Sequence, residues 1–246
     1  MKKYNWLLFF VGALILSSIL LYVLHYLIFR DVNHIFIYMI GDIAFLPIEV
    51  LLVTLIIHRL LNMQERRSKM NKLNMVIGAF FSKVGTRLLT YLSDCDPDLE
   101  SIRKDLIVSK EWGDPEFTRI NELLKAYDYG VDMEKVDLEG VREFLTGNMN
   151  FMIRLLENPV LLEHEYFTEL LWAVFHLTEE LNNREDMKSL PDTDIEHLSG
   201  DVKRAYGLLV REWLFYMKHL KDRYPYLFSL AMRMNPFDQE ASVIIK

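Results

Sequence analysis

The chain has 246 residues, 51% of them hydrophobic, and a formal net charge of −7 at pH 7. This acidic balance argues against general nucleic-acid binding, which needs a basic surface to displace counterions, so no nucleic-acid partner is expected. Nearly all of the charge follows His58. The length and this uneven charge predict an apolar N-terminal part followed by one globular domain of ordinary size.

Two long apolar runs, residues 6–29 and 35–57, open the sequence and are separated by a short polar linker. Each reaches the roughly 20 residues that a helix needs to cross a bilayer core. Residues 1–60 are therefore predicted to form a transmembrane helical hairpin. Lys2 and Lys3 precede the first run and a basic cluster follows the second. The positive-inside rule then predicts a two-span protein of the cytoplasmic membrane with both termini in the cytoplasm.

Four polar side chains interrupt the two apolar runs. Ser18 and His25 are seven residues apart, as are Asp42 and Glu49, so each pair shares one helical face. Facing residues of an antiparallel hairpin have a nearly constant index sum, which predicts that His25 meets Asp42 and Ser18 meets Glu49. A charged group at the centre of a membrane helix costs roughly 2.5–3.5 kcal/mol, so unpaired acids are rare there and these residues are expected to have a structural or functional role. Holding the helices in register is our preferred interpretation, and a proton or cation pathway in an oligomer is the alternative.

Residues 61–93 are predicted to extend the second helix as a basic juxtamembrane and connecting segment. A cluster of cations near its start is expected to face the lipid bilayer and its anionic headgroups. These cations are Arg59, Arg66, Arg67, Lys69 and Lys72.

Small residues form a stripe further along the connecting helix. Gly78, Ser82 and Gly85 lie at positions i, i+4 and i+7, a spacing that lets a neighbouring helix approach closely. Packing inside the domain is the preferred interpretation, and a homodimer seam is the alternative.

Residues 94–246 are predicted to form a cytoplasmic helical bundle, which makes the whole chain all-α. The starts of several helices are indicated by Asp96-Pro97, Asp114-Pro115, Asn158-Pro159 and a capping box from Thr193 to Glu196. The predicted helices cover residues 97–108, 115–128, 137–157, 159–183, 194–222 and 225–234.

Acidic and histidine side chains gather on one face of the predicted helix 159–183, namely Glu165, Glu169, His176 and Glu180. The chain has neither the paired Glu-x-x-His of a di-iron bundle nor the HExxH of a zinc protease. The face is therefore interpreted as a solvated polar surface. No metal, no cofactor and no catalytic residue is predicted, because nucleotide-binding, hydrolase and kinase motifs are also absent from the sequence.

Two stretches carry a resemblance to known sequences. They run from Gly41 to Pro47 (GDIAFLP) and from Asn74 to Phe81 (NMVIGAFF). With them the chain resembles a group of uncharacterised prokaryotic membrane proteins that have two transmembrane helices and a helical cytoplasmic domain. The resemblance implies this architecture and brings no activity, cofactor or site.

Three hypotheses for function follow. The first is a membrane-anchored, all-helical interaction, scaffold or sensor protein, working with a protein partner or as a homo-oligomer. The second is an oligomeric proton or cation pathway that uses Asp42 and Glu49. The third is a membrane-tethered enzyme with a Glu/His site in the helical domain.

Overall fold

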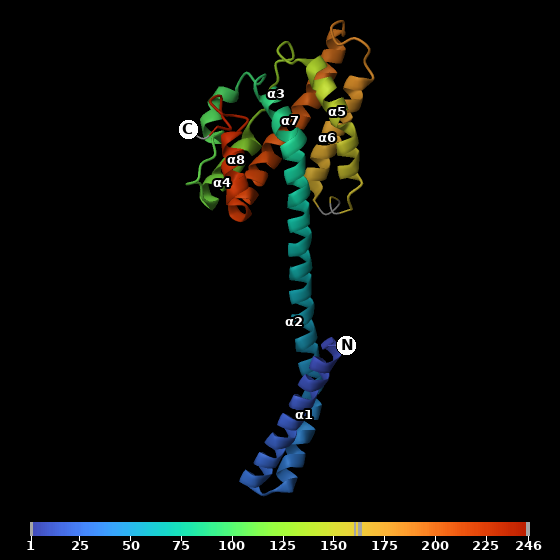
Figure 1. The fold of residues 1–246 in the computed structure, drawn as a ribbon, viewed down its shortest axis with the longest axis vertical. Coiled ribbons are helices and arrows are strands. Elements are labelled where there is room, and N and C mark those ends of the chain that lie inside the picture. Colours follow the sequence, from blue (N-terminus) through green and yellow to red (C-terminus); the bar gives the residue numbers. More distant parts are fainter. Residues whose placement is uncertain (1, 160, 162–163, 245–246) are drawn as a thin grey trace. The chain divides into compact units, whose positions relative to one another are not determined.

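The computed structural model describes residues 2–159, 161 and 164–244, and its regular elements in these ranges are helices (Figure 1). The chain divides into two compact units, Met1–Arg66 and Arg67–Lys246. An apolar helix pair is followed by a helical domain, which confirms the predicted all-α class and order of parts.

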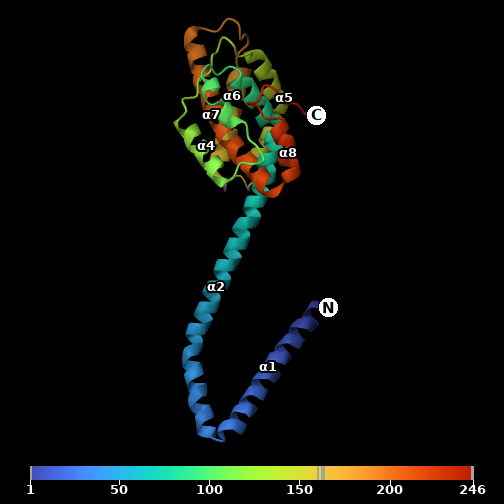
Figure 2. The same cartoon turned by 90° about the vertical axis from the view of Figure 1, so that its left-hand side faces the viewer.

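The first unit contains α1 (Lys2–Phe29) and the N-terminal part of α2 (Val32–Phe80). The two helices meet at Arg30 and Asp31 and separate from there (Figure 2). Arg30 takes a left-handed backbone conformation with φ of 51°, and the Asp31 carboxylate accepts a hydrogen bond from the Asn33 amide at 2.9 Å. Both helices are long and apolar enough to cross a membrane, and their most apolar windows bury no residue within the protein.

The second unit receives the last turns of α2, where Leu73, Ile77 and Phe80 are buried. The remaining elements follow in order: the π-helix Phe81–Gly85, α3 (Thr86–Ser93), the 3₁₀ turns Leu99–Ser101 and Arg103–Leu106, α4 (Asp114–Ala126), α5 (Leu138–Leu156), α6 (Glu165–Asn182), α7 (Asp192–Arg223) and α8 (Pro225–Arg233).

Helix α7 is the central element of the domain. It packs against α3, α4, α6, α8 and the π-helix, while α6 also packs against α5 (Figure 1). Its core-facing side chains include Tyr206 and Trp213, both fully buried. Burying large aromatic side chains from one long helix gives this domain a single shared apolar core.

The predicted helix 97–108 is wrong, because this stretch forms two short 3₁₀ turns. The side chain of Asp96 does not cap an α-helix. One of its oxygens accepts from the Asp98 amide at 3.1 Å, and the other accepts from the hydroxyls of Tyr127 and Tyr206 at 2.9 and 3.1 Å. These tertiary hydrogen bonds outweigh the local helix-start signal.

One other predicted helix start and one predicted cap are also wrong. Helix α6 begins at Glu165 rather than 159, with the Nδ1 atom of His164 accepting from the Phe167 amide at 3.1 Å. Of the expected first turn, residues 160 and 162–163 lie outside the described residues. Helix α7 begins at Asp192, so Thr193 lies inside the first turn and does not act as its cap.

A π-helix joins α2 to α3 and contains the buried Gly85. A Cβ atom at this position would lie 2.6 Å from Cδ1 of Phe81 and 2.8 Å from Cε1 of Phe80. Both rings are fully buried, so neither can move aside without disturbing the core. Glycine is therefore required here for close packing.

The substitution Gly85→Ala is expected to lower the free energy of unfolding by about 1–3 kcal/mol, the usual range for overpacking a core. Thermal unfolding followed by tryptophan fluorescence measures the change. The matched control is Gly147→Ala in α5, where nothing lies within 4 Å of the added methyl group. This control is expected to leave stability unchanged or raise it by up to about 1 kcal/mol through helix propensity. Equal effects at both positions would contradict the packing argument.

A buried acid, Glu212, lies on α7 with 2% of its surface exposed. Its Oε2 atom has no hydrogen-bond partner among the described residues. Burial raises the pKa of Glu212 from its ordinary value near 4.5 to about 7, and the neighbouring positive charge of Arg211 opposes this shift only in part. The folded protein therefore retains a proton that the unfolded chain releases.

The contribution of Glu212 to stability is expected to fall as pH rises from about 4.5 to about 7, because in this window the folded state holds the Glu212 proton and the unfolded state does not. Glu212→Gln removes the titrating group and keeps its shape. The stability difference between variant and wild type should shift in the variant's favour by on the order of 2–3 kcal/mol between pH 4 and pH 8. Unfolding curves at both pH values measure this difference, and parallel pH profiles would refute it.

Candidate functional site

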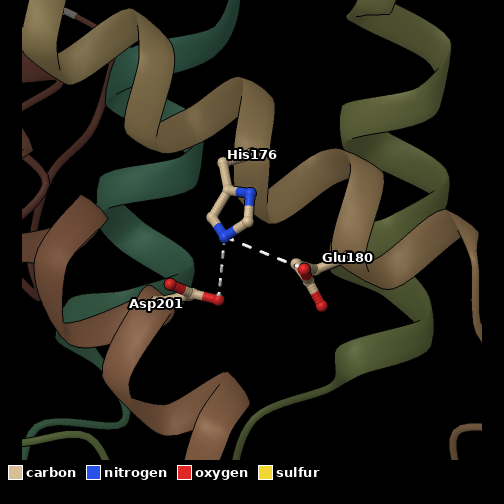
Figure 3. Close-up of side chains that lie close together, drawn as sticks. All are labelled: His176, Glu180 and Asp201. Atoms are coloured by element: carbon tan, nitrogen blue, oxygen red, sulfur yellow. Dashed lines mark ion pairs between the residues drawn. The ribbon is translucent and has the colours of Figure 1, made fainter.

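A cluster of two histidines and two carboxylates lies between α6 and α7. Figure 3 shows His176 and Glu180 on α6 pointing toward Asp201 on α7, with dashed lines joining the histidine to each carboxylate. His197, also on α7, approaches the same two carboxylates.

The cluster follows from a spacing that both helices share. His176 and Glu180 are four residues apart on α6, and His197 and Asp201 are four residues apart on α7. Residues at i and i+4 lie on one face of a helix, so each helix presents one imidazole and one carboxylate to its neighbour. The packing of α6 against α7 brings the two pairs together.

The distances form a closed ring around the cluster. The Nε2 atom of His176 lies 3.4 Å from Oδ2 of Asp201 and 3.8 Å from Oε1 of Glu180. The Nε2 atom of His197 lies 3.5 Å from Oδ2 of Asp201 and 3.6 Å from Oε2 of Glu180. Each imidazole therefore faces both carboxylates at separations longer than an ordinary hydrogen bond of 2.7–3.2 Å.

Two arginines position the carboxylates from outside this ring. Arg184 donates to Oε2 of Glu180 at 2.8 Å and forms a two-pronged pair with Asp194 at 2.6 and 2.7 Å. Arg204 donates to Oδ1 of Asp201 at 3.3 Å. The hydrogen bond from Arg184 lowers the pKa of Glu180, so this acid is ionised at neutral pH.

Asp201 is the buried member of the cluster, with 5% of its surface exposed. Its Oδ2 atom, which faces both histidines, has no hydrogen-bond partner among the residues that the structure describes. Leaving a buried acceptor unsatisfied costs about 1–3 kcal/mol, and more for a charged group. The two histidine side chains are 45% and 54% exposed, so the cluster opens to solvent on their side.

Two of these residues were grouped on one helical face from the sequence, and that face was interpreted as a solvated polar surface without a metal. Of the four residues expected on one face, His176 and Glu180 enter the cluster, whereas Glu165 and Glu169 are exposed and lie outside it. His197 and Asp201 were not predicted as members. Their signal is present in the sequence as the repeated spacing His-x-x-x-Glu and His-x-x-x-Asp on two neighbouring helices.

Three of the four polar residues of the first unit share one hollow, and the predicted pairing between them stays a prediction. His25 shares a hydrogen bond with His34, with 3.1 Å between Nε2 and Nδ1. Ser18, His25 and Asp42 line one hollow of about 330 Å³, and Glu49 is not among its lining residues. Asp42 and Glu49 are both exposed on α2.

The predicted basic cluster lies along α2. Arg59, Arg66, Arg67 and Lys72 are exposed, and Lys69 is half-buried.

The small residues separate into two environments. Gly78 and Ser82 line an apolar groove of about 550 Å³ between the end of α2, α7 and α8. Asn74 and His219 share a hydrogen bond of 3.1 Å in the same groove. Gly85, at the end of the π-helix, is buried and is not among the residues that line the groove.

The fold and the cluster define a two-part, all-helical class of protein, an apolar helix pair followed by a helical domain. The chain belongs to the family of the uncharacterised protein MJ1433. The family's C-terminal helical domain matches residues 69–233, and its N-terminal helical domain matches residues 2–61. The uncharacterised protein MJ1433 of Methanocaldococcus jannaschii is 47% identical over 244 residues, covering 99% of this chain and 98% of that protein.

No solved structure matches this chain. The predicted resemblance to an uncharacterised family of helical proteins is thus confirmed, whereas membrane insertion, orientation and partners remain predictions.

Proposed function

We propose that this protein is a membrane-anchored helical interaction module that self-associates through its apolar helix pair and carries a cytoplasmic binding domain. The observation that supports this most strongly is the exposed apolar surface of α1 and α2, whose most apolar windows bury nothing within the chain. Soluble proteins rarely expose continuous apolar surfaces of this size. Lipid is the environment that covers such a surface at no cost.

Self-association follows from the two acids within the apolar part of α2. Asp42 and Glu49 are both exposed in the single chain, and Glu49 does not line the hollow of the hairpin. An uncovered charge within a bilayer costs roughly 2.5–3.5 kcal/mol. A second copy of the helix pair supplies hydrogen-bond partners and covers these groups, since polar side chains hold membrane helices together.

The orientation is supported by the distribution of cations. Arg59, Arg66, Arg67 and Lys72 are exposed on the part of α2 that follows its apolar run. Cations at this position favour the cytoplasmic side and attract anionic headgroups by about 1 kcal/mol each. The helical domain then faces the cytoplasm, and α2 connects it directly to the membrane because its last turns enter the domain core.

The test is the oligomeric state of the full-length chain in mild detergent and in lipid nanodiscs, measured by light scattering and mass photometry. The wild-type chain is expected to be a dimer or larger. Glu49→Ala combined with Asp42→Ala is expected to shift the protein toward monomer, with a loss of about 1–2 kcal/mol per removed interhelical hydrogen bond.

Thr54→Ala is the matched control, because Thr54 is an exposed polar residue of the same helix that carries no charge. This variant should keep the wild-type oligomeric state. A wild-type chain that is monomeric in both detergent and nanodiscs would refute self-association, and a chain recovered without membranes would refute anchoring.

The second candidate function is a proton or cation pathway, favoured by the hollow that Ser18, His25 and Asp42 share. A titratable imidazole beside a carboxylate within a membrane helix pair is a recurrent arrangement in proton relays. Two helices cannot enclose such a route by themselves, so this function requires the oligomer.

Proton flux into liposomes that contain the full-length chain tests this candidate. Asp42→Asn should abolish flux above the background of empty liposomes, because the amide cannot exchange a proton. Thr54→Ala should leave flux unchanged. Equal flux for wild type and Asp42→Asn would eliminate the pathway.

A further inference from the structure

We infer that His176, His197, Glu180 and Asp201 form a binding site for one divalent transition-metal ion of the zinc class. This site does not depend on the proposed membrane function, since all four residues belong to α6 and α7 of the helical domain.

The first observation is the geometry of the four side chains. The ring of Nε2-to-oxygen distances measures 3.4, 3.5, 3.6 and 3.8 Å. Zinc bonds of 2.0–2.2 Å to nitrogen and oxygen place the ligand atoms of a tetrahedral site about 3.3–3.6 Å apart. These four distances approximate the edges of such a site, although Glu180 presents Oε1 to His176 and Oε2 to His197. His176, Glu180 and one Asp201 oxygen lie within 4.8 Å of one another as a group. His197 lies outside this three-residue group and would complete the site by a side-chain rotation.

The second observation is the orphaned oxygen of Asp201. This residue is 95% buried, since only 5% of its surface is exposed, and its Oδ2 atom points into the ring without a hydrogen-bond donor among the described residues. Direct ion pairs with protonated histidines are the competing explanation. Both imidazole nitrogens, however, stand 3.4–3.5 Å from this oxygen, beyond ordinary hydrogen-bond length. A cation between the groups satisfies the oxygen and both nitrogens at once.

The surroundings are those of a metal site. The opposite oxygen of Asp201 is held by Arg204, and Glu180 is held by Arg184, which in turn is fixed by Asp194. Outer residues of this kind orient the carboxylate ligands of metals. Two imidazoles with two carboxylates suit zinc and its first-row neighbours better than magnesium or calcium, which prefer oxygen ligands alone. The exposed histidines leave a path for the ion to enter.

The test uses the full-length chain in mild detergent, stripped with a chelator and then titrated with Zn²⁺ against a chromophoric competitor. One zinc per chain is expected. His176→Gln and His197→Gln should each weaken binding by at least about tenfold, because each removes one ligand. Co²⁺ should give the visible bands of a tetrahedral site in the wild type and lose them in either variant.

His219→Gln is the matched control, because His219 belongs to the same helix α7 but lies in the apolar groove, bonded to Asn74. It should bind zinc as the wild type does. Thermal unfolding without metal checks that the ligand variants fold, and added zinc should raise the melting temperature of the wild type and of His219→Gln only. Substoichiometric zinc, or affinity unchanged in the His176→Gln, His197→Gln double variant, would overturn the site.

Discussion

The packing of the neighbouring elements around α7 is the constraint on which the helical domain depends. This helix supplies the fully buried Tyr206 and Trp213, and it packs against α3, α4, α6, α8 and the π-helix. It also carries Asp201, His197 and the buried Glu212, so the polar chemistry of the domain is positioned by the same helix that forms its apolar core. A change in the packed position of α7 would therefore alter both the stability of the domain and the geometry of the cluster.

The transition along α2 gives the chain its two-part character. Up to residue 66 the helix belongs to a unit whose apolar side chains face outward, and from Leu73 onward it belongs to a unit whose apolar side chains face a core. No loop separates these two roles within the helix. The backbone follows one helical hydrogen-bond pattern throughout. The two parts of the helix differ only in which side chains they present.

Most of the fold could be predicted from periodicity, because long amphipathic helices such as α5 and α7 carry a strong repeating signal. Local start signals were less reliable. Asp96 was expected to cap a helix, but its carboxylate instead accepts hydrogen bonds from two tyrosine hydroxyls in distant parts of the chain. The sequence placed His176 and Glu180 on one helical face but did not predict the cluster, because their meeting with His197 and Asp201 depends on which helices are neighbours. The predicted pairing across the hairpin stays a prediction: His25 and Asp42 line the same hollow, and His25 also shares a hydrogen bond with His34.

The four side chains of the cluster come in equal shares from two helices, and this has a mechanical consequence. An axial slide of α6 along α7 by one turn, about 5.4 Å, would separate every imidazole from the carboxylate of the opposite helix in the same step. Smaller displacements would also move each carboxylate out of line with the imidazole of the opposite helix. A cation bound in the cluster would therefore fix the axial position of α6 relative to α7.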